Sequence, residues 1–353
     1  MNKIDDFLKD ALKKDSSDLH FISGDPPRVR VHGGLQTLGN EVLTTEFVRE
    51  ALYEIMNGAT QRDFERHDAV DFAYEIADIS RFRVNVMRHL NGVGAVFRAI
   101  PSQAKSLEEL NLPDVVDSLC KQTSGLILVT GKTGSGKSTT LAAMIDAINR
   151  RLKGHILTIE DPIEFVHHRK NCLISQREVG VHAASFADAL HSALREDPDV
   201  ILVGELRDLE TMSVAITAAE MGILVMGTLH TNGAAQTVDR IVNSFPADKQ
   251  SHIRTMLSTS LRGVISQQLL PTKHKPGRIA ALEILINTSA VANLIRQGKL
   301  DQLETAMQSG ANVGMQTMDN ALMSLVERRF VSGIEAYQQA HNKTKFQQVK
   351  DQR

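Results

Sequence analysis

One short stretch near the middle of the chain constrains its fold more than any other. Residues 126–130 form an apolar run of β type, and the next eight residues read Gly-Lys-Thr-Gly-Ser-Gly-Lys-Ser, the G-x-x-x-x-G-K-S pattern of a phosphate-binding loop (P-loop). Its glycines let the backbone turn where a Cβ would clash, so that successive N–H groups point at phosphate oxygens. Apolar residues then recur at helical spacing over residues 139–150, so the positive end of a helix faces the phosphates.

This loop predicts a site for ATP and Mg²⁺. Lys137 is placed to reach the β- and γ-phosphates, and the hydroxyl of Ser138 is placed to ligate Mg²⁺. The residues predicted to bind the nucleotide are Gly131, Lys132, Thr133, Gly134, Ser135, Gly136, Lys137, Ser138 and Thr139.

Composition narrows the possible classes of function. The 353 residues are enough for two domains, and a net charge of −2 gives no reason to expect strong non-specific binding of nucleic acid. The two cysteines form no C-x-x-C pair, which argues for a reducing compartment and against structural zinc. The N-terminus has no signal-peptide core, and no apolar run approaches the roughly 18–20 residues of a membrane span. We therefore expect a cytoplasmic protein without direct membrane insertion.

The first hundred residues have the pattern of a small α+β domain. Helical spacing favours helices over residues 3–14 and 45–56. Short apolar or alternating runs predict strands at 18–22, 28–31, 70–76, 82–87 and 93–100. A polar connector follows from Pro101 to Pro113.

From residue 125 onward the pattern changes. Apolar runs that alternate with helical segments predict strands at 126–130, 156–159, 200–203, 223–229 and 279–285. Such alternation is typical of a mostly parallel sheet that helices cover on both faces. After about residue 287 the pattern is helical only.

Polar residues at the ends of these strands are candidates for catalysis. In open α/β sheets, ligands bind beyond the carboxyl ends of the strands. Glu205 follows the strand at 200–203, so we expect it near the γ-phosphate, where it would orient or deprotonate a water. The usual Walker-B aspartate position holds Gly204, so Mg²⁺ must rely on Ser138, on water and on carboxylates elsewhere, with water-mediated contact to Glu205 or Glu160.

Two further strands end in candidate residues. Glu160, Asp161 and Glu164 follow the strand at 156–159, and one or more of them is expected to hold a metal-bound or attacking water. His230 closes the strand at 223–229 and is a candidate sensor of the γ-phosphate.

Arginines mark the first domain. Arg81 and Arg83 lie two residues apart on one face of a predicted strand, and Arg98 lies on the next strand. A solvated sheet face is one interpretation. The other is a set of arginine fingers that the first domain, of the same or a neighbouring subunit, supplies to the nucleotide.

Together these residues resemble the secretion-type motor ATPases of type II secretion and type IV pili, over nearly the whole chain. The P-loop at 131–139, the acidic box at 158–167, the Walker-B stretch at 201–208 and the histidine box ending at 227–231 all match that family. Its pilus-retraction branch is the most similar, because residues 81–85, 194–199, 294–299 and 314–319 resemble it closely.

The resemblance implies a fold, an assembly and partners. It implies a PAS-like α+β N-terminal domain (1–100), a linker (101–113), a RecA-like P-loop core of α/β type (114–286) and a C-terminal helical region (287–353). It also implies a homohexamer that couples ATP hydrolysis to pilus retraction through an inner-membrane platform protein, at the cytoplasmic side of that membrane.

Three positions depart from the family pattern without removing a residue that phosphate or water chemistry needs. Lys132 stands where the retraction branch has proline, and Leu206 stands where it has methionine. Ile223 replaces a histidine at the start of the histidine box, which leaves His230 as the only histidine of that box.

Other functions remain open at this point. The chain could be an accessory retraction paralogue, or an extension or type II secretion ATPase, although extension ATPases carry a four-cysteine metal insert that two cysteines cannot build. From other classes, it could be a nucleotide-gated scaffold or a RecA-like nucleic-acid motor. Near-neutral charge, three tyrosines and no tryptophan weigh against nucleic acid as a partner.

Overall fold

The computed structural model describes residues 2–14, 16–31, 34–77, 79–100, 104–274 and 277–350. The chain divides into two compact units, the first made of Met1–Gln103 with Glu164–Val166 and the second of Ala104–Ile163 with His167–Arg353. Residues 101–103 of the expected connector lie outside the described residues.

The first unit contains an antiparallel sheet. Within the described residues the strand order is β3-β2-β1-β6-β5-β4, and every neighbouring pair is antiparallel. Its elements are α1 (Asp5–Lys13), β1 (Asp18–Ile22), β2 (Arg28–Val31), β3 (Gly34–Thr37), α2 (Thr45–Ile55), α3 (Gly58–His67), β4 (Ala69–Ile76), β5 (Ser80–His89) and β6 (Gly92–Ile100).

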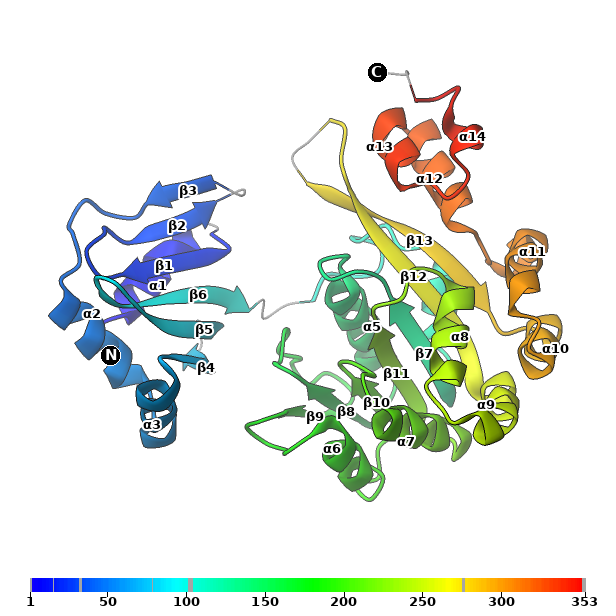
Figure 1. Cartoon of the computed structure of the whole chain (residues 1–353), viewed down its shortest axis with the longest axis horizontal. Helices are drawn as coiled ribbons and strands as arrows, with labels where there is room; N and C mark the ends of the chain where they lie inside the picture. Colours follow the sequence, from blue (N-terminus) through cyan, green and yellow to red (C-terminus); the bar gives the residue numbers. More distant parts are fainter. Residues whose placement is uncertain are drawn as a thin grey trace. The chain divides into compact units, whose positions relative to one another are not determined.

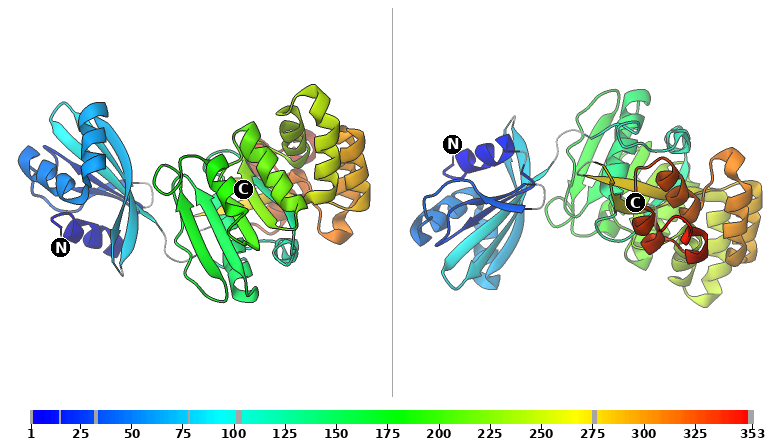
Figure 2. Two further views of the ribbon diagram at one scale, coloured as in Figure 1. Left: turned by 90° about the horizontal axis from the view of Figure 1, so that it is seen from below. Right: turned by 90° about the horizontal axis from the view of Figure 1, so that it is seen from above.

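Alternation along the strands gives this sheet one apolar and one polar face. On β5, Phe82 and Val84 are buried, whereas Arg83 between them is exposed. The buried side chains pack against α1, α2 and α3 in a single core (Figure 2). The opposite face carries charged side chains such as Arg83 and Arg98.

The second unit is built on a seven-stranded sheet in the order β13-β12-β7-β11-β10-β8-β9, counted over the described residues (Figure 1). All pairs are parallel except β12 with β13. The strands are β7 (Gly125–Thr130), β8 (His155–Glu160), β9 (Leu173–Glu178), β10 (Val200–Val203), β11 (Leu224–Leu229), β12 (Leu261–Pro271) and β13 (Arg278–Ile286).

Helices cover both faces of this sheet, as parallel strands require. Along β7, Leu126 and Leu128 belong to the core beneath the helices α6 to α11, whereas Ile127 and Val129 belong to the core beneath α4 and α5. The helices are α4 (Asp114–Leu119), α5 (Lys137–Arg151), α6 (Phe186–Ala193), α7 (Leu209–Glu220), α8 (Ala234–Asn243), α9 (Ala247–Ser260), α10 (Ser289–Gln297) and α11 (Leu303–Ser309), with 3₁₀ turns at Leu300–Gln302 and Ala311–Val313.

The last three helices have a core of their own. They are α12 (Met318–Glu327), α13 (Gly333–Gln339) and α14 (Lys343–Phe346). Their apolar side chains pack on Leu270 of β12 and Ala281 of β13, near the ends of those two long strands (Figure 1).

A buried carboxylate on β13 joins two of these helical layers. Glu283 Oε1 accepts a hydrogen bond from the backbone N–H of Ala234 at 2.7 Å, and Oε2 accepts one from the N–H of Met318 at 3.3 Å. These are the first residues of α8 and α12, so one negative charge satisfies donors at two helix N-termini.

The predicted elements are found with boundaries that match or differ by at most two residues, but several further elements were not predicted from the sequence. These are β3, α3, β9 and β12. β9 reads Leu-Ile-Ser-Gln-Arg-Glu, and β12 carries Ser266, Gln267 and Gln268 in its middle. Their polar residues hide the apolar run by which a buried parallel strand is recognised.

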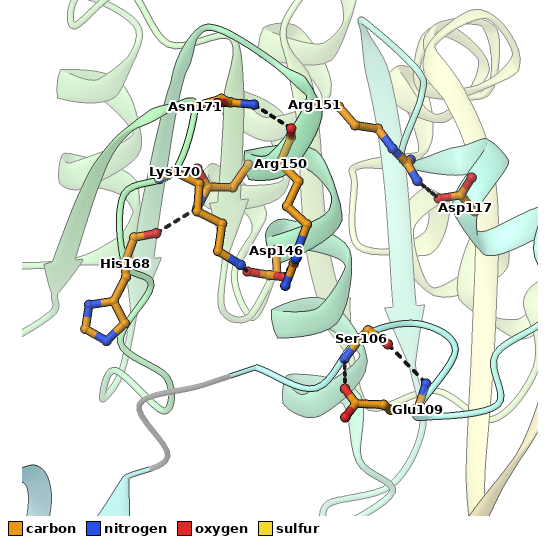
Figure 3. A network of polar contacts seen from close by, with 10 residues as sticks. Ser106, Glu109, Asp117, Asp146, Arg150, Arg151, His168, Lys170 and Asn171 are labelled. Carbon is orange, nitrogen blue, oxygen red and sulfur yellow. Dashed lines mark hydrogen bonds and ion pairs between the residues drawn. The ribbon is translucent and has the colours of Figure 1, made fainter.

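A charged network ties the loop before β9 to the C-terminal half of α5 (Figure 3). Asp146 pairs with Lys170, and it accepts a hydrogen bond from Arg150 Nε at 2.7 Å. Burial alone would raise the pKa of the Asp146 carboxyl, but the hydrogen bonds and charges of Lys170 and Arg150 outweigh it and lower that pKa. The network therefore stabilises the fold only while Asp146 is ionised.

Asp146→Asn should lower the free energy of unfolding by about 1–2 kcal/mol at pH 7, because both cations are partly exposed and the pair is only partly desolvated. A lowered pKa means that the stabilisation is complete above the unfolded-state pKa of about 4 and is lost as the pH falls through the lower folded-state pKa. Urea unfolding of parent and variant at about pH 7, 4 and 2 should show a gap that narrows between the two most acid conditions. Asp239→Asn, an exposed change on α8, is the matched control, and a gap that stays unchanged down to the most acid condition would contradict the ionic account.

Candidate functional site

Four parallel strands bring the predicted residues of the second unit to one edge of its sheet. β7, β8, β10 and β11 run parallel, and β11 lies between β7 and β10. The segments that follow them carry the P-loop, the acidic box, Glu205 and His230. The edge at which strands end is also where open α/β sheets bind ligands.

The P-loop has the backbone that its sequence predicts. Gly131, Gly134 and Gly136 have φ of +139°, +79° and +90°, a region that favours glycine. Lys137 is buried, and its Nζ donates to the backbone carbonyls of Gly131 at 2.9 Å and Lys132 at 3.2 Å. The ammonium group therefore lies across the loop.

Two observations indicate that this loop fits a phosphate. Helix α5 begins at Lys137 with Gly136 as its N-cap, so no side chain caps its first backbone N–H groups. The hydroxyl of Ser135 is buried and has no hydrogen-bond partner among the residues that the structure describes. Uncapped amides, a buried hydroxyl and an ammonium group form an anion-binding site. Of the other predicted residues, Lys132, Thr133 and Gly134 are exposed, and Ser138 and Thr139 are half-buried.

Glu205 lies between the side chains of an arginine and a histidine. Its Oε2 is 2.8 Å from Arg207 Nε, and its Oε1 is 3.2 Å from His230 Nε2. The structure thus brings together two predicted residues, Glu205 and His230, and adds Arg207, to which the sequence assigned no role. The signal for Arg207 was weak, because it is only the presence of a cationic residue two positions after Glu205.

The glycine before Glu205 has a steric reason. A Cβ at Gly204 would lie 3.1 Å from the carbonyl oxygen of Ile159 and 3.2 Å from the Cα of Glu160. Both contacts are tighter than nearly all real Cβ contacts, so an aspartate in this position would press β10 away from β8.

The acidic box is held by side chains of β9. Glu160 is buried, and its Oε1 accepts from Thr158 Oγ1 at 2.6 Å and from Gln176 Nε2 at 3.2 Å. Glu178 Oε2 accepts from the backbone N–H of Ile163 at 3.2 Å. Asp161 and Glu164 are exposed, so of the three predicted acids of the box Glu160 alone is buried.

A cavity of about 700 Å³ adjoins the P-loop. Gly136 and Thr139 line one part of it, and the cationic side chains of Lys105, Arg278 and Arg329 line others. The cavity gives room beside the start of α5 for a group larger than phosphate.

In the first unit, the predicted arginines lie on the polar face of the sheet. Arg83 and Arg98 are register partners on β5 and β6, so their side chains are direct neighbours. Arg98 Nε pairs with Asp18 Oδ1 at 2.8 Å, and Arg83 Nε lies 3.7 Å from Asp71 Oδ1. Arg81 is half-buried on the same face.

Proteins of known function resemble this chain along nearly its whole length. A family model described as type II/IV secretion system protein matches residues 1–293. The type IV pilus retraction ATPase PilT of Pseudomonas aeruginosa is 50% identical over 337 residues, which cover 96% of this chain and 98% of that protein. A twitching motility protein of Neisseria gonorrhoeae is 50% identical over 333 residues, covering 93% and 89%.

A solved structure agrees. The crystal structure of the pilus retraction motor PilT with bound ADP has a TM-score of 0.91 to this chain at 43% identity, and the match covers 98% of each. The chain belongs to the pilus retraction ATPases. Membership confirms the resemblance, the α/β fold with its N-terminal domain, ATPase core and helical C-terminal region, and the ATPase activity that the sequence predicted. No helix in the described ranges is long and apolar enough to cross a membrane.

Glu205→Gln should leave nucleotide bound and lower turnover by about 100-fold or more, because only the acceptance of a proton in the transition state is removed. ADP affinity by fluorescence titration and steady-state phosphate release would measure the two effects separately. Glu210→Gln, an exposed change in the first turn of α7, is the control and should behave as the parent. A Glu205→Gln variant that hydrolyses ATP at the parental rate would refute the assignment.

Proposed function

We propose that this chain is a Mg²⁺-dependent motor ATPase that assembles as a homohexamer and uses ATP hydrolysis to retract type IV pili, which would disassemble the fibre and drive twitching motility. The proposal rests on the 50% identity to PilT of P. aeruginosa. The matched region covers 96% of this chain, so it includes C-terminal helices as well as the core. An extension or type II secretion ATPase, or an accessory retraction paralogue, is the alternative within the class.

Nucleotide binding would use the P-loop and the cavity beside it. The P-loop amides and Lys137 would hold the β- and γ-phosphates, and the cavity would take the nucleoside. Ser138 would ligate Mg²⁺ directly, with Glu205 or Glu160 acting through water. The described residues contain no group of three or more His, Cys, Asp or Glu side chains that could hold a metal ion by themselves. Mg²⁺ suits such a site, because it is usually held by substrate phosphates, water and one or two protein ligands.

Hydrolysis would depend on Glu205. We assign it the role of activating water, assisted by Glu164 or Glu160, with His230 sensing the γ-phosphate. The contacts of Glu205 with Arg207 and His230 support this role, because a catalytic carboxylate needs a fixed orientation.

The arginines of the first domain would complete the site in the ring. Arg83 and Arg98 lie directly opposite each other, and like charges in that position repel. Each has a carboxylate nearby, Asp71 for Arg83 and Asp18 for Arg98, yet both side chains stay exposed on the same face. We therefore assign Arg81 and Arg83, with Arg98, to the stabilisation of transition-state charge. We assign residues 1–100 to the PAS-like domain, 101–113 to the linker, 114–286 to the RecA-like core and 287–353 to the helical region.

The expected partner is an inner-membrane pilus platform protein, which would place the ring on the cytoplasmic side of that membrane. A nucleic-acid motor and a nucleotide-gated scaffold are the alternatives from other classes. Loss of the gene should leave cells that still form pili but fail to retract them. Loss of pili altogether would favour an extension ATPase, and normal retraction would favour an accessory role.

Arg83→Ala should still assemble and bind ATP, yet turn over about 10³-fold more slowly, because losing an arginine finger removes transition-state stabilisation. Size-exclusion chromatography, nucleotide titration and phosphate release measure the three properties. Arg88→Ala, also an exposed arginine of β5, is the control. Full activity in a strictly monomeric preparation would contradict the ring-dependent site.

Arg296→Ala combined with Lys299→Ala should separate motor activity from pilus retraction. Both residues are exposed at the end of α10, and Arg296 makes one hydrogen bond, to Ser258 Oγ at 3.2 Å. Changes at such surface positions usually cost little stability, so hexamer and ATPase rate should stay within about twofold. The same cells should lose surface motility and carry excess pili. Asn293→Ala, on the same helix, is the control, and retraction by the double variant would show that this segment is only a structural cap.

A further inference from the structure

The strand β12 extends past the P-loop strand β7. Ser266 is opposite Thr130, the last residue of β7, and β12 continues to Pro271. Gln267 therefore lies beside Gly131, where the P-loop begins. It is buried, and its neighbour Gln268 is only half-buried.

The side-chain amide of Gln267 holds the P-loop at two points. Its Nε2 donates to the backbone carbonyl of Ser135 at 2.7 Å, and its Oε1 accepts from the hydroxyl of Thr140 at 2.7 Å. Ser135 lies near the end of the loop, and Thr140 lies in the first turn of α5. The amide thus joins the loop to the helix that follows it.

Two glycines of the P-loop leave room for this one residue. A Cβ at Gly136 would lie 2.7 Å from Gln267 Nε2, and a Cβ at Gly131 would lie 2.3 Å from the backbone oxygen of Gln267. Real Cβ atoms essentially never come this close, so a side chain at Gly131 would push the backbone of β12 away and one at Gly136 would displace the Gln267 amide. Glycine at these positions is therefore required for the approach of β12 as well as for the turn.

The amide suits this pair of contacts because it carries both a donor and an acceptor. The Ser135 carbonyl can only accept a hydrogen bond, so the NH₂ end of Gln267 must face it, and the oxygen end is left for the Thr140 hydroxyl. A carboxylate lacks the donor, and an apolar side chain lacks both groups.

The contact with Ser135 also fixes the direction of an N–H group. The Ser135 carbonyl and the Gly136 N–H belong to one planar trans peptide, so they point in opposite directions. Because Gln267 holds the carbonyl on its own side, the Gly136 N–H points away from Gln267. The amide so directed belongs to the N-cap residue of α5, at the anion-binding end of the helix.

We propose that Gln267 is a positioning residue that holds the P-loop in its phosphate-binding shape and thereby sets the affinity for nucleotide. Its amide acts through Ser135 and Thr140. The inference rests on the proposed function only in requiring nucleotide at the P-loop.

The test compares matched variants of the full chain. Gln267→Met keeps the length of the side chain and removes both hydrogen bonds, and Gln268→Met makes the same change one residue along β12. Thr140→Val keeps the shape and removes the donor, whereas Thr140→Ser keeps the donor. For each we would measure the Kd of a fluorescent ADP analogue, KM and kcat for ATP, and the melting temperature without nucleotide.

Gln267→Met should raise Kd and KM by about tenfold or more, because a buried carbonyl and a buried hydroxyl lose their partner. At saturating ATP, kcat should change less than threefold, since the residue does not act on the reacting atoms. Thr140→Val should raise Kd by about threefold to tenfold, Thr140→Ser should recover most of that loss, and Gln268→Met should bind as the parent does.

Nucleotide affinity within twofold of the parent in Gln267→Met would overturn the proposal. If that variant does not fold, the two Thr140 variants decide, because equal affinity in the valine and serine variants would show that the hydrogen bond is not used. A parent that binds no nucleotide would instead refute the proposed function.

Discussion

The parallel pairing of β7, β8, β10 and β11 is the constraint on which the candidate chemistry depends. Parallel strands end at the same edge, so four segments that are far apart in the sequence meet beside one P-loop. The order of the strands sets the distances within that edge. Because β11 separates β7 from β10, His230 at the end of β11 is placed to reach Glu205, which follows β10.

Polar side chains that are buried or half-buried fix the loops at this edge. Gln267 of β12 holds the P-loop, Gln176 and Glu178 of β9 hold the acidic box, and Glu283 of β13 holds the start of α8. Each lies on a strand that carries no candidate for the chemistry. The four strands that carry candidate residues are therefore flanked by supporting strands on both sides within the sheet. Such supporting residues keep the geometry of a site without taking part in its chemistry.

Two of these supporting strands, β9 and β12, are also among the elements that the sequence did not predict, whereas β13 was predicted at residues 279–285. The strands β7, β8, β10 and β11 are continuous apolar runs, and such runs are readily recognised. In β9 and β12 the same polar residues that hold the loops interrupt the apolar pattern. Departures from pattern are expected where residues serve a site rather than the core.

The P-loop was predictable because its residues follow one another in a recognisable motif. Glu205 and His230 were predictable because each directly follows a predicted strand or lies within two residues of its end. Arg207 and Gln267 were not, because their contacts arise from tertiary structure. Strand register was not predictable either. The sequence analysis placed Arg98 on the strand after that of Arg83, but it could not show that the two residues lie directly opposite each other.

We expect a single nucleotide site at this sheet edge to account for all ATP binding and hydrolysis by the chain. The most direct measurement is ADP binding and ATP turnover by the parent and by Lys137→Ala, which removes the ammonium group across the P-loop and leaves the rest of the sheet edge in place. We predict that the parent binds one nucleotide per chain and hydrolyses ATP, and that the folded variant does neither. Binding and turnover by Lys137→Ala at the parental level would contradict the account.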